Sequence, residues 1–208
     1  MAISARQIER QNFIIGKQLQ KMEANQQFTL FQKNPDKYDE FLILLHPQTG
    51  HFAKQKHVLE LKTIYGNDSH KYYFPYSPPS VRFLTQIYHT NISREGSICL
   101  DIFKDPSKWS AQNTIETVMN YIIALLDSPN TSSAFNLEPS KHWTIGEKNY
   151  KIYKSENKKA SVKEDMIAET RIFADYVKTA DEIASKNNLE QWAEYFPCLL
   201  DLSKMNMS

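Results

Sequence analysis

Two cysteines, Cys99 and Cys198, lie far apart in this chain of 208 residues, and the first follows a glycine turn. A thiol with an ordinary pKa of ~8.5 is slightly ionised at neutral pH, so cysteine is a nucleophile that needs little activation. The segment SREGS, which contains Gly96, predicts a turn that brings Cys99 to the start of the next apolar run. Cys99 is thus a candidate nucleophile. The alternative is that it is a small buried hydrophobe, the commoner role of a single cysteine.

The segment before Cys99 predicts how the cysteine is held. Three prolines, Pro75, Pro78 and Pro79, fix the backbone and remove hydrogen-bond donors, so this stretch cannot be a helix or a central strand. The prolines predict a rigid connection. The following SVRFL alternates polar and apolar residues, which predicts a short strand with one buried face. We therefore expect Cys99 on a defined backbone and not on a flexible tip.

Residues 74–103, FPYSPPSVRFLTQIYHTNISREGSICLDIF, resemble the active-site region of the ubiquitin-conjugating enzymes. The family signature is a proline-rich turn, a strand, a His-Pro-Asn motif, the nucleophilic cysteine, a Leu-Asp-Ile-like segment, a tryptophan and a Thr-Ile that opens a helix. Asn91 precedes Cys99 by eight residues, as the family's asparagine precedes its cysteine. The resemblance extends more weakly over roughly residues 8–155. The matching residues are Pro75, Tyr76, Pro78, Pro79, His89, Asn91, Gly96, Cys99, Leu100, Asp101, Trp109, Thr114 and Ile115.

The resemblance implies a two-step acyl transfer. An activating enzyme passes ubiquitin, or a ubiquitin-like modifier, to Cys99 as a thioester, and a lysine of a protein substrate then attacks that carbonyl with the help of a ubiquitin ligase. ATP is used by the activating enzyme, so the resemblance implies no cofactor and no metal in this chain.

The resemblance also assigns roles to residues around Cys99. By this resemblance, Asn91 stabilises the oxyanion or holds the loop in front of the cysteine. The alternative is that its side chain only stabilises the turn in which it lies. Asp101 helps to activate the incoming lysine, unless it is a solvated carboxylate at the end of a strand. Ser133 falls at the family's gate position, and His89 is a structural residue that organises the loop. Trp109 is the second structural residue of the motif.

Tyr76, Ser110 and Ala111 occupy the positions that contact ligases in the family. Ala111 replaces a family proline, and Trp109 follows Cys99 by ten positions, a longer interval than in most ubiquitin-type members. The conjugating enzyme for the modifier SUMO has a similar, longer interval between its cysteine and tryptophan, so a modifier other than ubiquitin is an open alternative.

Several departures favour a second alternative, an interaction module that keeps the fold without transferring a modifier. Thr90 replaces the proline of the His-Pro-Asn motif, which restores a backbone N–H and predicts a less rigid placement of Asn91. Phe13 and Ile14 stand where the family's first helix carries basic residues; packing of these two side chains against the C-terminal extension is an equally good interpretation. The inactive variants of the family lack the cysteine, which this chain retains.

Composition excludes other classes of function. Lys and Arg total 25 and Asp and Glu total 24, so the chain lacks the charge footprint of a nucleic-acid or membrane-surface binder. No signal peptide, apolar run of about 18 residues or disulfide framework is readable, which predicts a reducing cytoplasmic or nuclear setting. His46, His51 and His57 have no cysteine nearby, and no metal-ligand spacing or glycine-rich loop is present.

The pattern of apolar residues predicts an α+β fold like that of the family. A helix over residues 3–24 precedes four apolar runs, QFTLFQ, EFLILLH, VLELKTIY and SVRFL, which predict a four-stranded antiparallel meander. After the active-site segment, NTIETVMNYIIALLDSPN predicts a helix capped by Asn113 and Glu116. The predicted domains are a catalytic domain over residues 1–156 and a helical extension over residues 157–208.

The extension leaves the family pattern. Ser161 and Glu164 are spaced as a capping box, and a long helix with one apolar face is expected to follow. That face contains Phe173, Val177, Ala180 and Ala184. Leu189, Trp192, Phe196 and Leu199 then form a shorter amphipathic segment limited by Pro197. We expect this extension to dock on the catalytic domain; presenting a helix to a partner is the alternative.

Overall fold

The structure is a computed structural model, and it describes residues 4–48, 50, 52–53, 55–67, 71–137, 139–141, 143 and 176–199. The predicted capping box at Ser161 and Glu164, and Phe173 in the predicted apolar face, lie outside these residues.

The chain begins with α1 (Ala5–Met22), which confirms the predicted N-terminal helix. Ser4 caps it, since the Ser4 hydroxyl accepts from the Gln7 backbone and the Gln7 side chain accepts from the Ser4 backbone. Ile15 and Met22 are buried on its inner face. Phe13 is 62% exposed, with the ammonium of Lys17 over its ring, so the interpretation that Phe13 packs against the extension is wrong.

Four antiparallel strands form the central sheet in the order β1-β2-β3-β6, which confirms the predicted meander. The expectation that VLELKTIY continues as one strand is wrong. The chain turns at Thr63, whose hydroxyl donates to the Tyr38 carbonyl at 2.5 Å, and β4 then pairs with β5 in a separate sheet. The strands are β1 (Phe28–Asn34), β2 (Lys37–Leu45), β3 (His57–Lys62), β4 (Ile64–Gly66), β5 (Lys71–Tyr73) and β6 (Ser80–Phe83).

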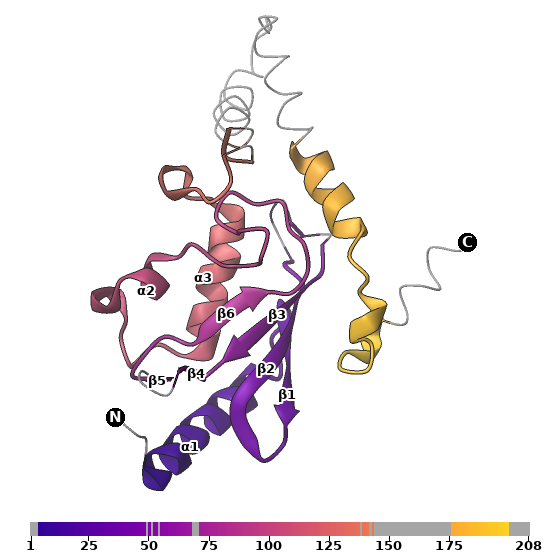
Figure 1. Cartoon of the computed structure of the whole chain (residues 1–208). Helices are drawn as coiled ribbons and strands as arrows, with labels where there is room; N and C mark the ends of the chain where they lie inside the picture. Colours follow the sequence, from indigo (N-terminus) through magenta and orange to yellow (C-terminus); the bar gives the residue numbers. More distant parts are fainter. Residues whose placement is uncertain are drawn as a thin grey trace, which may run out of the picture.

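The inner face of the sheet packs on α3 (Ile115–Asp127), and this contact forms the main core (Figure 1). Side chains alternate along the strands, so Phe41 and Ile43 face the helix. The helix lies where the sequence predicted it, but its cap is Thr114, whose hydroxyl accepts from the Thr117 backbone at 3.0 Å. The predicted cap pair was therefore one position too early.

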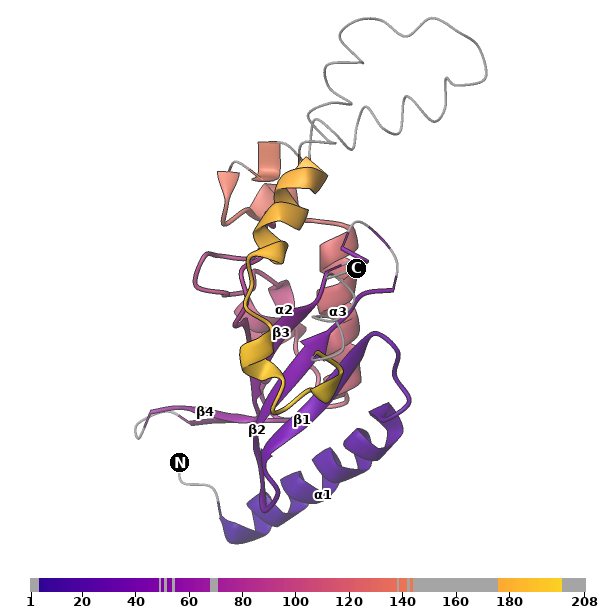
Figure 2. The same ribbon diagram turned by 90° about the vertical axis from the view of Figure 1, so that its right-hand side faces the viewer.

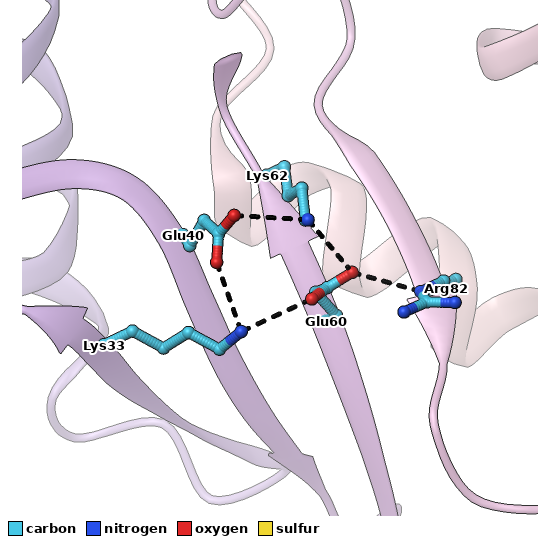
Figure 3. A network of polar contacts seen from close by, with 5 residues as sticks. All are labelled: Lys33, Glu40, Glu60, Lys62 and Arg82. Atoms are coloured by element: carbon cyan, nitrogen blue, oxygen red, sulfur yellow. Dashed lines mark hydrogen bonds and ion pairs between the residues drawn. The ribbon is translucent and has the colours of Figure 1, made fainter. Parts of the chain in front are cut away.

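The outer face of the sheet has two halves of different character. Leu42, Leu44 and Val58 form a second apolar cluster, which C-terminal residues cover. The other half is polar. There Glu60 lies between three cations, and Glu40 joins two of them, as Figure 3 shows. The network consists of Lys33, Glu40, Glu60, Lys62 and Arg82.

The described C-terminal residues pack on two parts of the domain: Tyr176 and Ala180 join the main core, whereas residues 189–199 lie on the outer face of the sheet, opposite α3 (Figures 1 and 2). A helix over residues 176–185 precedes two single turns, η3 (Glu190–Trp192) and η4 (Pro197–Leu199). Phe196 and Leu199 are buried against the sheet, so docking is confirmed for residues 176–199. None of the helices in the described ranges is long and apolar enough to cross a membrane.

Polar contacts fix this segment as well. The Gln55 side chain donates to the Asp181 carboxylate at 2.9 Å, and the Tyr176 hydroxyl donates to the Tyr88 carbonyl at 3.1 Å. Asn187 makes a paired contact with the backbone of Gln86, accepting at 2.7 Å and donating at 2.9 Å. The extension is thereby attached to the loop that follows β6, a few residues before the candidate active site.

Candidate active site

Cys99 closes a narrow loop that begins at Asn91. The Cys99 N–H donates to the Asn91 carbonyl at 2.8 Å, and the Ser93 N–H donates to the Ser97 carbonyl at 2.9 Å. Gly96 has a φ of +85°, and a Cβ there would lie 1.9 Å from the Phe83 carbonyl oxygen. Only glycine fits such a position. The predicted turn at Gly96 is confirmed, and it places Cys99 on a rigid loop braced by β6.

The Cys99 side chain is only 6% exposed and lies among polar groups from later in the chain. Its Sγ donates to the backbone carbonyl of Ser133 at 3.1 Å and lies 3.2 Å from the Ser133 hydroxyl. On another side the Lys104 ammonium donates to Sγ at 2.7 Å. Ser133, predicted to occupy the gate position, thus lies against the thiol, and Lys104, which was not predicted, lies there too.

Asn91 is fully buried and joins the cysteine loop to η2 (Thr131–Ser133). Its Nδ2 donates to the carbonyls of Asn130 and Ser133, at 2.8 and 3.0 Å, and its Oδ1 accepts from the Asn130 N–H at 2.8 Å. A carboxamide has two N–H donors, and both are used here. In this geometry the Asn91 carboxamide joins the cysteine loop to the loop that carries Ser133.

His89 is buried behind Asn91 and has both ring nitrogens engaged. Nδ1 accepts from the Asn91 N–H at 3.0 Å and Nε2 faces the Leu125 carbonyl of α3 at 3.1 Å, so Nε2 carries the proton. Burial lowers the pKa of His89 to about 4, because desolvation penalises the charged ring more than the bond to Leu125 favours it. The ring is therefore neutral at pH 7. This arrangement is that of a structural residue.

Thr90, the residue in place of the motif proline, is fully buried, and its carbonyl accepts from the backbone N–H groups of Phe135 and Asn136, at 2.9 and 3.2 Å. The Asn136 side chain donates to the carbonyls of His89 and Ile92, at 3.1 and 2.5 Å. These bonds add to those that Asn130 makes with Asn91. Neighbouring residues thus brace the turn that lacks a proline.

Asp101 begins the one-turn helix α2 (Asp101–Lys104) two residues after the cysteine. Its carboxylate is exposed and forms an ion pair with Lys108 at 2.7 Å. Asp101 would have to exchange Lys108 for an incoming lysine in order to activate it. Asp101 is therefore close to Cys99 in the sequence, but in this structure its carboxylate binds Lys108 and not an incoming lysine.

Trp109 and the proline turn are joined. The indole N–H of Trp109 donates to the Pro75 carbonyl at 2.7 Å, and its ring makes a T-shaped contact with that of Phe74, with centroids 6.2 Å apart. Tyr76 is 65% exposed, and Ser110 and Ala111 are exposed as well. The three residues expected to contact a ligase are therefore accessible, in two loops that Trp109 connects.

Three residues at this site were missed by the sequence analysis: Lys104, Asn130 and Asn136. Each makes its contact across a turn whose path is fixed by tertiary structure, so no spacing rule identifies it. Asn130 follows the proline that ends α3, a common place for a turn asparagine, which is the one available signal. Among the described residues, no three of the types His, Cys, Asp and Glu are grouped so that they could hold a metal ion.

Comparison with known proteins decides the family. The family model described as "Ubiquitin-conjugating enzyme" matches residues 14–159 of this chain. The chain belongs to the ubiquitin-conjugating enzyme family. The matched segment contains the cysteine loop, Asn91 and Ser133, together with the sheet and α3 that support them.

Individual members of the family show the same relationship. "Ubiquitin-conjugating enzyme E2-20 kDa" of Schizosaccharomyces pombe is 38% identical over 78 residues, which are 38% of this chain and 43% of that protein. "Ubiquitin-conjugating enzyme E2 N" of Drosophila melanogaster is 45% identical over 74 residues, 36% of this chain and 48% of that protein. The Macaca fascicularis protein of the same name is 43% identical over 74 residues, 36% and 47% of the two chains. The chain thus spans about half the length of the curated relatives it matches.

Proposed function

We propose that this protein is an active ubiquitin-conjugating enzyme. It accepts ubiquitin from an activating enzyme as a thioester on Cys99 and transfers it to a lysine of a protein substrate, with a ligase. One observation carries the proposal: Cys99 Sγ lies 3.1 Å from the Ser133 carbonyl, in a loop that Asn91 ties to the same carbonyl, inside the region that matches the family. A cysteine serving only as a small hydrophobe has no need of these polar neighbours.

Within this proposal the surrounding residues have distinct roles. Asn91 positions the loop that carries Ser133, which supports a gate role for Ser133 beside the thioester. Asp101 assists the incoming lysine after releasing Lys108. His89 and Trp109 are structural: one supports Asn91 from the core, and the other joins the two exposed loops.

The partners follow from the same family membership. The activating enzyme binds and uses ATP, so the conjugating enzyme itself needs no nucleotide site. Ligases dock on the two loops joined by Trp109, which expose Tyr76, Ser110 and Ala111. Their exposure supports this assignment, and the lost proline at 111 favours a ligase set that does not rely on that side chain.

Ubiquitin is the favoured modifier because the relatives named above carry ubiquitin in their names. The interval from Cys99 to Trp109, which left SUMO open, contains α2 and η1 (Pro106–Lys108). The loss of the motif proline at Thr90 was an argument for a non-transferring interaction module. That argument is weakened because Phe135 and Asn136 brace the turn in the absence of the proline.

A discharge experiment tests the whole reaction. The protein is charged with ubiquitin by an activating enzyme and ATP, the ATP is then removed, and free lysine is added. We expect a reductant-sensitive adduct that disappears faster as the lysine concentration rises. The Cys99→Ser variant should form a reductant-stable ester or no adduct. A charged protein whose adduct decays at the same rate with and without lysine would overturn the transfer step.

A further inference from the structure

The loop between β6 and the candidate active site is supported by the C-terminal segment. Residues 84–89 of this loop contain no helix and no strand. Both backbone polar groups of Gln86 bond to one carboxamide: its N–H donates to Asn187 Oδ1 at 2.7 Å, and its carbonyl accepts from Asn187 Nδ2 at 2.9 Å. The Asn187 side chain thus does for this loop what a neighbouring strand does in a sheet, because it pairs with the donor and the acceptor of one residue.

A second bond from the same segment reaches the loop next to the motif. Tyr176 is fully buried, and its hydroxyl donates to the Tyr88 carbonyl at 3.1 Å. The two tyrosine rings also lie side by side, with centroids 5.4 Å apart. Tyr88 directly precedes His89, the first residue of the motif. The C-terminal segment therefore fixes the loop at two points, three residues and one residue before His89.

Two chains of contacts lead from this loop to the nucleophile. The first runs through His89, whose Nδ1 accepts from the N–H of Asn91, and the Asn91 side chain donates to the Ser133 carbonyl beside the sulfur. The second runs through the Gln86 side chain, whose Nε2 donates to the Arg94 carbonyl at 3.4 Å, in the turn that precedes the cysteine. Gln86 thus joins the C-terminal segment to the cysteine loop.

This support lies where the motif lacks its proline. A proline at position 90 would fix its own φ and restrict the residue before it to extended conformations. Thr90 imposes neither restriction, so the backbone that leads to Asn91 depends on contacts made from other parts of the chain. Phe135 and Asn136 hold the turn at Thr90 itself, and the C-terminal segment holds the backbone that leads into the turn.

We propose that Asn187 is a positioning residue for the transfer reaction. It holds the loop that leads into the His-Thr-Asn motif, and it thereby places Asn91 and the Ser133 carbonyl in front of the thioester. The inference rests on thioester transfer at Cys99, as proposed above. It gives the C-terminal extension a part in the chemistry, because the docked segment completes the support of the active site. A misplacement of about 1 Å, caused far from the chemistry, can slow a reaction by about 10²-fold.

The alternative role of Asn187 is to end the helix over residues 176–185. Its N–H donates to the Ala184 carbonyl at 3.1 Å, as in the last turn of a helix. That bond uses the backbone alone, whereas the side chain reaches Gln86, 101 positions away in the sequence. Asn188, the next residue, has the same side chain but is exposed, and it provides a matched control.

The test measures transfer per charged molecule. Wild-type, Asn187→Ala and Asn188→Ala proteins are charged with ubiquitin, ATP is removed, and the loss of thioester to free lysine is followed. The rate constant refers to charged protein only, so a smaller folded fraction does not change it. We expect Asn187→Ala to lower this rate constant by about tenfold and Asn188→Ala to keep the wild-type value. The amide resonances of residues 89–91 should shift in Asn187→Ala alone, which a role in stability would not cause.

Tyr176→Phe is the second variant, and it removes only the hydroxyl that bonds to the loop. It should lower the same rate constant by about threefold, within the range that one hydrogen bond supplies. A wild-type rate constant in charged Asn187→Ala protein would overturn the positioning role and leave the conjugating activity standing. Where Asn187→Ala does not fold, a wild-type rate constant in Tyr176→Phe overturns it. A wild-type protein that forms no thioester, or does not lose it to lysine, would instead overturn the proposed function, and this inference with it.

Discussion

Asn91 and Cys99 donate hydrogen bonds to one acceptor, the backbone carbonyl of Ser133, at 3.0 and 3.1 Å. The loop after α3 is therefore coupled to the cysteine loop through a single peptide group. Because the second N–H of the same carboxamide bonds to the Asn130 carbonyl, Asn91 has both donors committed in this structure. The Asn91 side chain therefore joins the loop after α3 to the cysteine loop.

Asn91→Ala is expected to affect stability and chemistry together. The substitution removes the Asn91 hydrogen bonds to the Asn130 N–H and to the carbonyls of Asn130 and Ser133, which should lower the free energy of unfolding by about 1–3 kcal/mol. Urea unfolding and ubiquitin charging are the measurements. The same substitution at Asn113, outside this loop, should change stability by less than about 0.5 kcal/mol. An Asn91→Ala protein with unchanged stability and charging, but with transfer slowed by about 10²–10³, would instead identify an oxyanion donor.

Two glycine substitutions should act in opposite directions. Gly96→Ala forces a side chain into a left-handed backbone conformation and against the Phe83 carbonyl, so it should destabilise the protein by at least about 2 kcal/mol. Gly16 lies inside α1, where a Cβ would come no closer than 3.5 Å to Tyr38, and Gly16→Ala should stabilise the protein by about 0.5–1 kcal/mol. Thermal unfolding of both variants checks this pair. A Gly96→Ala protein as stable as the parent would contradict the described turn.

Mild acid should destabilise the fold through two buried histidines. Burial lowers the pKa of His57 to about 3 and that of His89 to about 4, against about 6.5 for histidine in an unfolded chain. Because the unfolded state takes up protons first, the stability is fully present above pH 6.5 and falls as the pH drops toward 4. Each ring should cost about 1.4 kcal/mol per pH unit within that window.

Urea unfolding at several pH values between 7 and 4.5 measures this slope. The His57→Gln variant should show a shallower slope than the wild type, because the contribution of the His57 ring is then lost. Where that variant is too unstable to measure, the wild-type slope decides. A free energy of unfolding that stays constant between pH 6.5 and 4.5 would contradict the buried neutral histidines.

The docked C-terminal segment should be released by one substitution in the apolar cluster it forms with the sheet. Phe196 is 2% exposed and packs on the cluster of Leu42, Leu44 and Val58, so Phe196→Ala should cost about 3 kcal/mol of docking free energy. That loss corresponds to roughly a hundredfold faster hydrogen exchange over residues 189–199. Leu137→Ala, at a side chain that is 72% exposed, is the control and should leave exchange unchanged. Equal exchange in the Phe196 variant and the wild type would show that the segment does not depend on this contact.

The sequence predicted the sheet, both long helices and the docking of the extension, because each depends on local periodicity. EFLILLH is apolar at consecutive positions, which is typical of a strand covered on both faces. The structure gives the reason: Phe41 and Ile43 face α3, whereas Leu42 and Leu44 face the extension. Which segment covers the outer face could not be predicted, since apolar residues match any apolar partner.

Local patterns failed where hydrogen bonds across the fold decide the outcome. VLELKTIY was predicted as one strand, but Thr63 bonds back to β2 through Tyr38 and Asp39 and ends β3 there. The cap of α3 moved by one residue because Asn113 and Thr114 are both good caps, and packing of Ile115 selects the second. Around Cys99 the structure brings together Asn91 and Ser133, which the motif named, but the contact with Lys104 requires α2, for which the sequence carries no clear signal.

The most direct measurement is the intact mass of the protein after incubation with ATP, ubiquitin and its activating enzyme, beside a parallel reaction with SUMO and the SUMO-activating enzyme. We predict a mass increase of one ubiquitin in the wild type, reversed by a thiol reductant, no such increase in Cys99→Ala, and no adduct with SUMO. A folded wild-type protein that gains no ubiquitin, or a Cys99→Ala variant that gains a reductant-sensitive one, would contradict the assignment of Cys99 as the residue that carries the thioester.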